Sequence, residues 1–212
     1  MADKINNKDD YANLTYTPTA DQLSLKLVLE YYDEYFEPYI YRYELENKDA
    51  IILKFAHSNF PHLIGIHYAP NEKYGRYSDE AKQFRGYAGY KGVKNGSIDK
   101  QKIKSMFLKK NEGYKNMTRK MRYFYNVHKI LESPSAVYYN ESANKGRKNS
   151  AIDCDIVLYK IINGQYVHVG LEKEGSKYVP KTFLIEPEPI FVEGQVVINI
   201  HKSKKVRHRR VK

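Results

Sequence analysis

The sequence contains no tryptophan, a single cysteine and no long apolar run. Cys154 cannot form an internal disulfide, so nothing in the composition indicates an oxidising compartment. The first residues lack the apolar segment of a signal peptide, and no stretch approaches the roughly 18–20 apolar residues that cross a bilayer. We therefore expect a cytoplasmic protein with no membrane partner.

Positive charge is concentrated at the C-terminal end of the chain. The 212 residues include 36 Lys and Arg against 25 Asp and Glu, and seven of these cations lie in residues 201–212, which contain no acid. We expect residues 1–18 to be flexible, residues 19–200 to form a single domain, and residues 201–212 to form a basic arm. Self-repulsion would keep such an arm disordered and available to polyanions, although a solubilising tail is an equally good interpretation.

The spacing of apolar residues changes along the N-terminal third. A capping box from Thr19 to Gln22 precedes a helix that Pro38 brings to an end. The period then changes to two, which predicts a β-hairpin with strands near 39–45 and 51–55. Residues 58–68 read as a short helix, with Ser58 as its cap and Pro61 in its first turn.

The sequence predicts a loop, then helices and then strands over the remainder of the chain. Residues 71–96 contain five glycines and no sustained periodicity, which predicts a loop. Two helices follow near 98–110 and 117–132, and Asn163-Gly164 predicts a tight hairpin turn among the later strands. We expect strands at 136–139, 155–162, 165–172, 181–186 and 190–200. The fold class is therefore α+β, a mainly antiparallel sheet with helices packed on one face.

Two histidines in the stretch SNFPHLIGIHY need an explanation. In one continuous helix His62 would lie at the rim of the apolar face, and His67 would lie about 140° away from it. Their five-residue spacing, with no cysteine or carboxylate cluster beside them, argues against a metal site. A satisfied structural histidine is the commoner outcome for either residue, and the spacing alone does not overturn it.

Three segments resemble the PBECR4 domain, a phage-associated family in the barnase–EndoU–colicin E5/D–RelE nuclease group. They are YIYRYELENKDAIILKFAHSNFPHLIGIHYA, DIVLYKIINGQYVHVGLEKEG and YVPKTFLIE, in residues 39–69, 155–175 and 178–186. The order of the segments also matches the family, over roughly residues 25–190. The resemblance implies a ribonuclease on a small α+β scaffold that needs no metal or other cofactor.

That chemistry needs a base for the 2′-hydroxyl, an acid for the leaving 5′-oxygen, and groups that stabilise charge on the phosphorane. On the matching motifs, the resemblance implies His62 as acid or base, with His67 able to exchange roles with it. Thr182 would contact the phosphate, and Lys181 or Arg122 would stabilise charge. Adjacent strand residues point to opposite faces, so Thr182 ranks above Lys181 unless a bulge intervenes.

Two further histidines have plainer interpretations. His168 alternates with two valines in a strand, so we expect it at a solvated sheet position. His128 lies on the apolar stripe of its helix and is more often a core residue than a ligand. The carboxylates around Asp153 and Glu172 lack the spacing of a metal-dependent nuclease, and no phosphate-binding glycine motif precedes a helix.

The tyrosine-rich segment from 71 to 96 interleaves aromatic rings with cations. Rings can stack on unpaired bases while cations follow the phosphates, although a chain with 21 tyrosines would show such a segment by composition alone. The residues that we expect to bind nucleic acid are Arg76, Arg85, Tyr87, Tyr90, Lys91, Lys204, Lys205, Arg207, Arg209 and Arg210.

Two functions of different class remain open on the sequence. The first is a ribonuclease of phage or mobile-element origin, of the toxin kind, that cleaves RNA by 2′-hydroxyl attack. The second is a non-catalytic protein on the same scaffold that binds nucleic acid or inhibits a host nucleoprotein. Either would have RNA or another nucleic acid as a partner, and an immunity protein, antitoxin or host target protein could join it.

Overall fold

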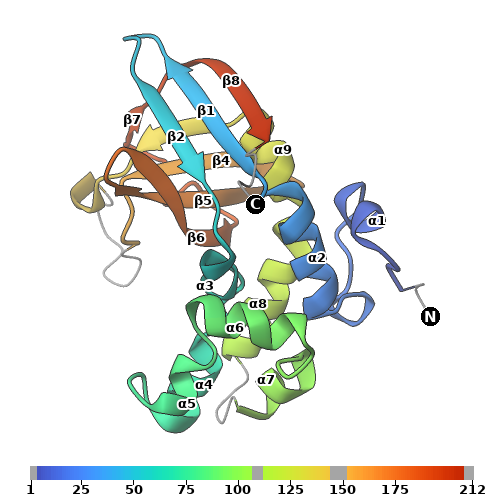
Figure 1. Cartoon of the computed structure of the whole chain (residues 1–212). Helices are drawn as coiled ribbons and strands as arrows, with labels where there is room; N and C mark the ends of the chain where they lie inside the picture. Colours follow the sequence, from blue (N-terminus) through green and yellow to red (C-terminus); the bar gives the residue numbers. More distant parts are fainter. Residues whose placement is uncertain (1–3, 107–111, 144–151, 208–212) are drawn as a thin grey trace. The chain divides into compact units, whose positions relative to one another are not determined.

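The structure is a computed structural model that describes residues 4–106, 112–143 and 152–207 (Figure 1). Helices and an eight-stranded sheet within these ranges confirm the α+β class. The chain divides into two compact units, a helical unit (residues 1–37 and 56–126) and a sheet unit (residues 38–55 and 127–212). The single domain over residues 19–200 stays a prediction. None of the helices in the described ranges is both long enough and apolar enough to cross a bilayer.

Short helices make up the helical unit. In chain order they are α1 (Lys8–Ala12), η1 (Ala20–Gln22), α2 (Leu25–Tyr35), η2 (His57–Asn59), α3 (Phe60–Ile64), α4 (Tyr68–Tyr74), α5 (Asp79–Lys82), α6 (Gly86–Lys94), α7 (Lys100–Met106), α8 (Glu112–Tyr123) and η3 (Phe124–Asn126). The capping box is confirmed, since the Thr19 amide donates to Gln22 Oε1 at 2.8 Å. It closes η1, and Ser24 caps α2 separately.

An aromatic cluster forms the core of this unit. The ring of Phe124 lies 5.8 Å from that of Phe36 and 6.1 Å from that of Tyr31, both edge to face. Buried tyrosines need partners for their hydroxyls. Tyr31 donates to the Tyr125 carbonyl at 2.9 Å, and Tyr32 donates to the Ala56 carbonyl at 2.6 Å. Much of the tyrosine content therefore serves the core.

The N-terminal segment is not the flexible tail that the sequence predicted. Asn7 caps α1 by accepting from the amides of Asp9 and Asp10. Tyr11 is completely buried in the aromatic cluster, where its hydroxyl donates to the Met121 carbonyl. Apolar burial and this hydrogen bond hold α1 against the rest of the unit.

The predicted loop over residues 71–96 is wrong, because this segment contains most of α4 and all of α5 and α6. Two of its glycines lie just beyond helix ends. Gly75 follows α4 and Gly96 follows α6, with φ near +89° and +81°. Gly89 allows α6 to pack closely, since a Cβ there would lie 2.6 Å from the Phe84 backbone. Helices this short lack the periodicity by which a longer helix is recognised.

The two later helices also differ from the prediction. α7 is described from Lys100 to Met106, and the last residues of the predicted helix, 107–110, lie outside the described ranges. The predicted helix over 117–132 is instead α8, the 3-10 turn η3 and α9 (Val127–Glu132). All three residues of η3 are buried, and the boundary between the two units falls directly after it.

The sheet unit contains α9, the 3-10 turn η4 (Glu141–Ala143) and the eight strands. The strands are β1 (Tyr39–Leu45), β2 (Ala50–Lys54), β3 (Ser135–Tyr138), β4 (Ile156–Ile162), β5 (Gln165–Glu174), β6 (Lys177–Glu186), β7 (Val196–Val197) and β8 (Ile200–Arg207). Their spatial order is β7-β3-β4-β5-β6-β2-β1-β8, and every pairing is antiparallel except β2 with β6. The mainly antiparallel sheet is confirmed, as is the turn at Asn163 and Gly164, whose φ angles are +51° and +70°.

The predicted disordered arm is wrong as far as Arg207, because residues 200–207 form the edge strand β8 on β1 (Figure 1). β1 supplies partners for its cations: Lys205 Nζ lies 4.1 Å from the centre of the Tyr39 ring, and Lys204 Nζ lies 3.5 Å from Glu44 Oε1. These contacts offset self-repulsion within the strand. Residues 208–212, with Arg209 and Arg210, lie outside the described ranges.

His168 in β5 is completely buried, not solvated as predicted. It lies among the rings of Tyr159, Tyr166 and Phe191, at 5.6–6.2 Å between centroids. Neither ring nitrogen makes a well-aligned hydrogen bond within the described ranges. Burial disfavours the charged form and lowers the pKa of His168 to about 4.

This depressed pKa predicts a pH-dependent stability. An unfolded histidine binds a proton below about pH 6.5, whereas folded His168 stays neutral down to about pH 4, so stability falls as pH drops through that window. At pH 4.5 the loss is on the order of 2–3 kcal/mol. We expect His168→Leu to reduce the fall in urea midpoint between pH 7 and pH 4.5, while the exposed His201→Leu leaves it unchanged. An identical fall in His168→Leu and wild type would contradict this.

Candidate active site in the helical unit

Gly65 determines how the two histidines of SNFPHLIGIHY meet. The sequence predicted one helix over 58–68, but α3 ends at Ile64, and Gly65 adopts a left-handed conformation with φ +86°. The Ile66 amide donates to the Pro61 carbonyl at 2.9 Å, and the Gly65 amide donates to the His62 carbonyl at 3.1 Å. This is a Schellman turn, in which a left-handed residue closes the helix. It reverses the chain, so His67 returns toward His62.

The rings of His62 and His67 are stacked. Their centroids lie 4.3 Å apart and their planes differ by 20°. His67 is 8% exposed, and its Nδ1 lies 3.4 Å from the Pro61 carbonyl, to which a neutral tautomer can donate. Burial, followed by the charge on His62, lowers the pKa of His67 to about 3. His67 is therefore neutral at physiological pH.

A pocket of about 400 Å³ opens beside this histidine pair. Arg85 reaches into its wall, where Nη2 donates to Asn71 Oδ1 at 2.5 Å. Arg85 Nε is buried and has no hydrogen-bond partner among the described residues. A guanidinium with a buried and unused donor is suited to an anionic ligand. The lining residues are His62, His67, Tyr68, Asn71, Arg76, Arg85 and Gly86.

Gly86, the first residue of α6, belongs to the same wall. The preceding residue Arg85 makes no side-chain cap, and the first amides of a helix have no partner within the helix and favour negative charge. The two arginines and the histidines make the pocket one that can hold a phosphate group and exchange protons with it.

Lys120 of α8 is a charged neighbour of the pair that the sequence did not single out. Its stem runs beside the turn, since a Cβ added at Gly65 would lie 3.8 Å from Lys120 Cδ. Its charge contributes to the depressed pKa of His67. Lys120 is half-buried, and burial lowers its own pKa to about 8. The only sequence signal was a lysine beside the buried Met121 in an amphipathic helix.

The structure brings only some of the predicted site residues together. His62, His67, Arg76 and Arg85 line one pocket. Arg122 belongs to the same unit, but its Nε donates to the Pro18 carbonyl at 2.6 Å and so helps to anchor the N-terminal segment.

The predicted nucleic-acid contacts are divided between the two units. Tyr90 is 2% exposed and has no free ring face, whereas Tyr87 and Lys91, also in α6, are exposed. Lys204, Lys205 and Arg207 lie in β8 of the sheet unit.

Thr182 and Lys181 belong to β6 in the sheet unit. The β5–β6 register shifts between Gly170 and Leu171, so that Thr182 faces Gly170 and Pro180 faces Leu171. Lys181 is the extra residue of this bulge, and its Nζ lies 2.6 Å from Glu172 Oε2. The Thr182 methyl would lie 2.6 Å from a Cβ built on Gly170, so the strands approach closely there. The role of Thr182 at a phosphate stays a prediction.

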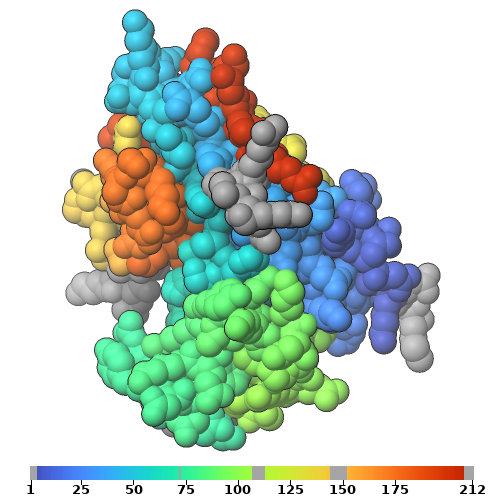
Figure 2. Space-filling view, viewed as in Figure 1, coloured from blue at the N-terminus to red at the C-terminus, as the bar shows by residue number. Residues whose placement is uncertain are grey.

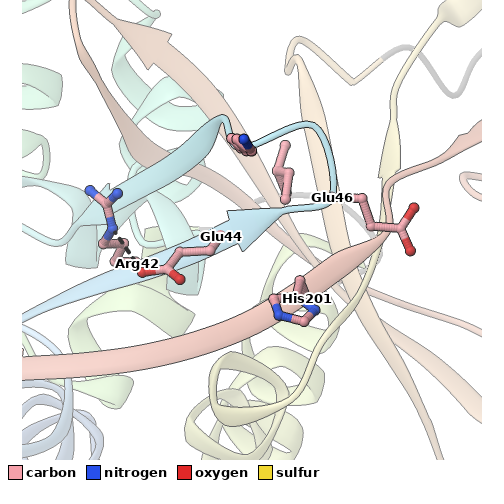
Figure 3. A pocket seen from close by; sticks show the side chains of 6 residues that line it. Arg42, Glu44, Glu46 and His201 are labelled. Carbon is pink, nitrogen blue, oxygen red and sulfur yellow. Dashed lines mark hydrogen bonds and ion pairs between the residues drawn. The ribbon is translucent and has the colours of Figure 1, made fainter.

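Other hollows in the sheet unit are less suited to an anion. One is a groove of about 570 Å³ lined by Arg42, Glu44, Glu46 and His201 among others. Arg42 and Glu44 form an ion pair there, with Glu46 and His201 nearby (Figure 3). Its carboxylates offset its cations. A second hollow contains Cys154, whose pKa burial raises to about 12, so it is a thiol and a poor nucleophile. The described residues contain no group of three His, Cys, Asp or Glu arranged for a metal ion.

A comparison with family models identifies the scaffold. The model described as phage-Barnase-EndoU-ColicinE5/D-RelE like nuclease4, PBECR4, matches residues 25–208. The match therefore extends through β8 and includes the histidine pocket. No curated protein and no solved structure matches the chain.

The left-handed turn at Gly65 predicts how substitutions at this position change the stability of the protein. An L-residue there is strained, and alanine should destabilise the protein by about 1–2 kcal/mol, while asparagine, which tolerates this conformation, should cost less. Urea denaturation of Gly65→Ala and Gly65→Asn measures the difference. Proton NMR should also show the mutual ring shifts of His62 and His67 reduced in Gly65→Ala. Equal stability of Gly65→Ala and wild type would show that the turn is not constrained.

Proposed function

The chain belongs to the PBECR4 nuclease family, and from that premise we propose that it cleaves RNA at the histidine pocket without a metal ion. The observation that carries this proposal is the stacked pair of His62 and His67 beside the buried, unpaired Nε of Arg85. One group that can move a proton and one that can bind a phosphate thus line a single pocket.

In the proposed reaction a phosphodiester binds against Arg76, Arg85 and the first amides of α6. His62 accepts the proton of the 2′-hydroxyl as that oxygen attacks the adjacent phosphorus. The bond to the 5′-oxygen breaks, and the proton passes from His62 to this leaving oxygen. The products are a 2′,3′-cyclic phosphate and a free 5′-hydroxyl. DNA has no 2′-hydroxyl, so this mechanism selects RNA.

His67 is a positioning residue in this scheme. Its pKa of about 3 makes it too weak a base to compete for the proton, and a second imidazolium 4.3 Å from the first would be repelled. Its ring instead fixes the orientation of His62 by stacking. The arginines and Lys120 stabilise the extra negative charge of the phosphorane.

A nuclease of this kind would damage the cell that makes it. We therefore propose an immunity or antitoxin protein as its partner. We also propose that it acts in the cytoplasm and that it originates from a phage or another mobile element. A non-catalytic protein that binds nucleic acid or a host nucleoprotein is the alternative, and the assay of RNA cleavage separates the two.

Replacement of His62 gives the first test. We expect the purified protein to cleave labelled single-stranded RNA in EDTA and to leave 2′,3′-cyclic phosphate ends. His62→Ala should reduce the rate by roughly 10²-fold or more, because proton transfer to and from the reacting oxygens is lost. His201→Ala, in the sheet unit, is the matched control and should cleave at the wild-type rate.

The outcomes of this assay are distinct. Absence of cleavage by wild type over varied RNA substrates would favour the non-catalytic binder. Cleavage that is abolished by EDTA and restored by a divalent cation would overturn the metal-independent mechanism. Full activity of folded His62→Ala would show that the histidine pocket is not the site of cleavage.

The pKa of Lys120 predicts the alkaline limb of the pH profile. Lys120 is charged below about pH 8 and neutral above it, so cleavage should slow as pH rises past 8. We expect Lys120→Arg, which keeps its charge, to stay active at higher pH, and Lys120→Met to be slow throughout. Lys115→Met, an exposed change on the same helix, is the control. An unchanged profile of kcat/KM in Lys120→Met would exclude this role.

A further inference from the structure

A cluster of three aromatic rings lies next to the candidate active site. Tyr87 stacks on Tyr90 with centroids 5.7 Å apart and planes that differ by 13°. His57 contacts both rings, at 4.2 Å from Tyr90 with planes tilted by 49° and at 6.2 Å from Tyr87. Arg85 and Gly86 line the pocket, and Tyr87 is the next residue of the chain. The green segment that contains α5 and α6 lies on the viewed surface of the helical unit (Figure 2).

Carboxylates contact His57 and Tyr90 of this cluster. Asp33 Oδ1 lies 3.7 Å from His57 Nε2, and Glu37 Oε1 lies 3.7 Å from His57 Nδ1. The Tyr90 hydroxyl donates to Asp33 Oδ2 at 2.8 Å. His57 and Tyr90 are therefore fixed by polar contacts as well as by packing, which gives Tyr87 a rigid support.

Tyr87 is the exposed ring of the cluster. It is 54% exposed, whereas Tyr90 is 2% exposed. Lys91 Nζ lies 5.0 Å from the centre of the Tyr87 ring, so a cation accompanies the exposed aromatic surface. A tyrosine that served only the core would not leave half its surface in water. One that stands on a buried stack and adjoins a cationic pocket is placed to receive a further ring.

We propose that Tyr87, supported by this cluster, is a stacking platform for an unpaired base and that the substrate class is single-stranded RNA. The inference rests on the proposed function, in which the pocket holds the scissile phosphate. A base beside that phosphate would extend the stack at Tyr87, and Lys91 would contact the neighbouring phosphate. Stacking on an aromatic ring requires a base that is splayed out of a helix. A duplex keeps its bases paired and cannot supply one.

Binding to probes that cannot be cleaved tests the platform. The probes are fluorescently labelled single-stranded 2′-O-methyl RNA, a duplex of the same length, and a single strand of the same length without bases. Tyr87→Ala should weaken binding of the single strand roughly 5- to 100-fold and leave binding of the strand without bases unchanged. Tyr87→Phe keeps the ring and should bind within about twofold of wild type. Tyr138→Ala, an exposed tyrosine of β3, is the matched control.

These outcomes separate the platform from the catalytic proposal, because a 2′-O-methyl probe has no nucleophile. The platform is overturned if Tyr87→Ala binds the single strand as wild type does, or if it loses equal affinity for the strand without bases. It is also overturned if wild type prefers the duplex. If Tyr87→Ala loses affinity as expected but wild-type protein cleaves no RNA, the platform stands and the catalytic proposal fails.

Discussion

The left-handed conformation of Gly65 is the constraint on which the candidate site depends. A side chain at that position would favour continuation of α3, and a continued helix would hold His62 and His67 about 140° apart. Closure of the helix by two backbone hydrogen bonds instead stacks the two rings at 4.3 Å. The same reversal leads into α4, which contributes Tyr68 and Asn71 to the pocket. Backbone geometry within residues 62–71 therefore builds the histidine end of the pocket, and Arg76, Arg85 and Gly86 complete it.

Electrostatics then assigns different roles to chemically similar groups. The two imidazoles, two arginines and Lys120 cannot all be charged in a small space without a large repulsive cost. Burial resolves this by keeping His67 neutral and bringing the pKa of Lys120 to about 8, while the arginines stay charged. An anionic ligand would relieve the remaining repulsion, so the pocket is better suited to a phosphate than to a neutral molecule.

Sequence patterns predicted the local elements well where their period is simple. The hairpin of β1 and β2, the Asn163-Gly164 turn and the strands β3 to β6 follow from alternation and turn residues. The single strand predicted over 190–200 is wrong, since only β7 and the first residue of β8 are strand within that range. The segment from 71 to 96 was misread, since its glycines mark the ends of short helices and the packing of Gly89, not a loop. The strand β8 was also missed, because its cations are stabilised by Tyr39 and Glu44, which lie about 160 residues earlier.

The candidate site was also predictable only where its residues are close in sequence. His62, His67, Arg76 and Arg85 are close in sequence, so a local motif can indicate them, whereas Lys120 reaches the turn from a distant helix. Tyrosines show the limit most clearly. Tyr87 and Tyr90 are three residues apart in one helix and were indistinguishable as candidates for base stacking. Asp33, more than fifty residues away, accepts the Tyr90 hydroxyl and fixes that ring in the interior. Only the folded contact separates a ring that supports the stack from a ring that can extend it.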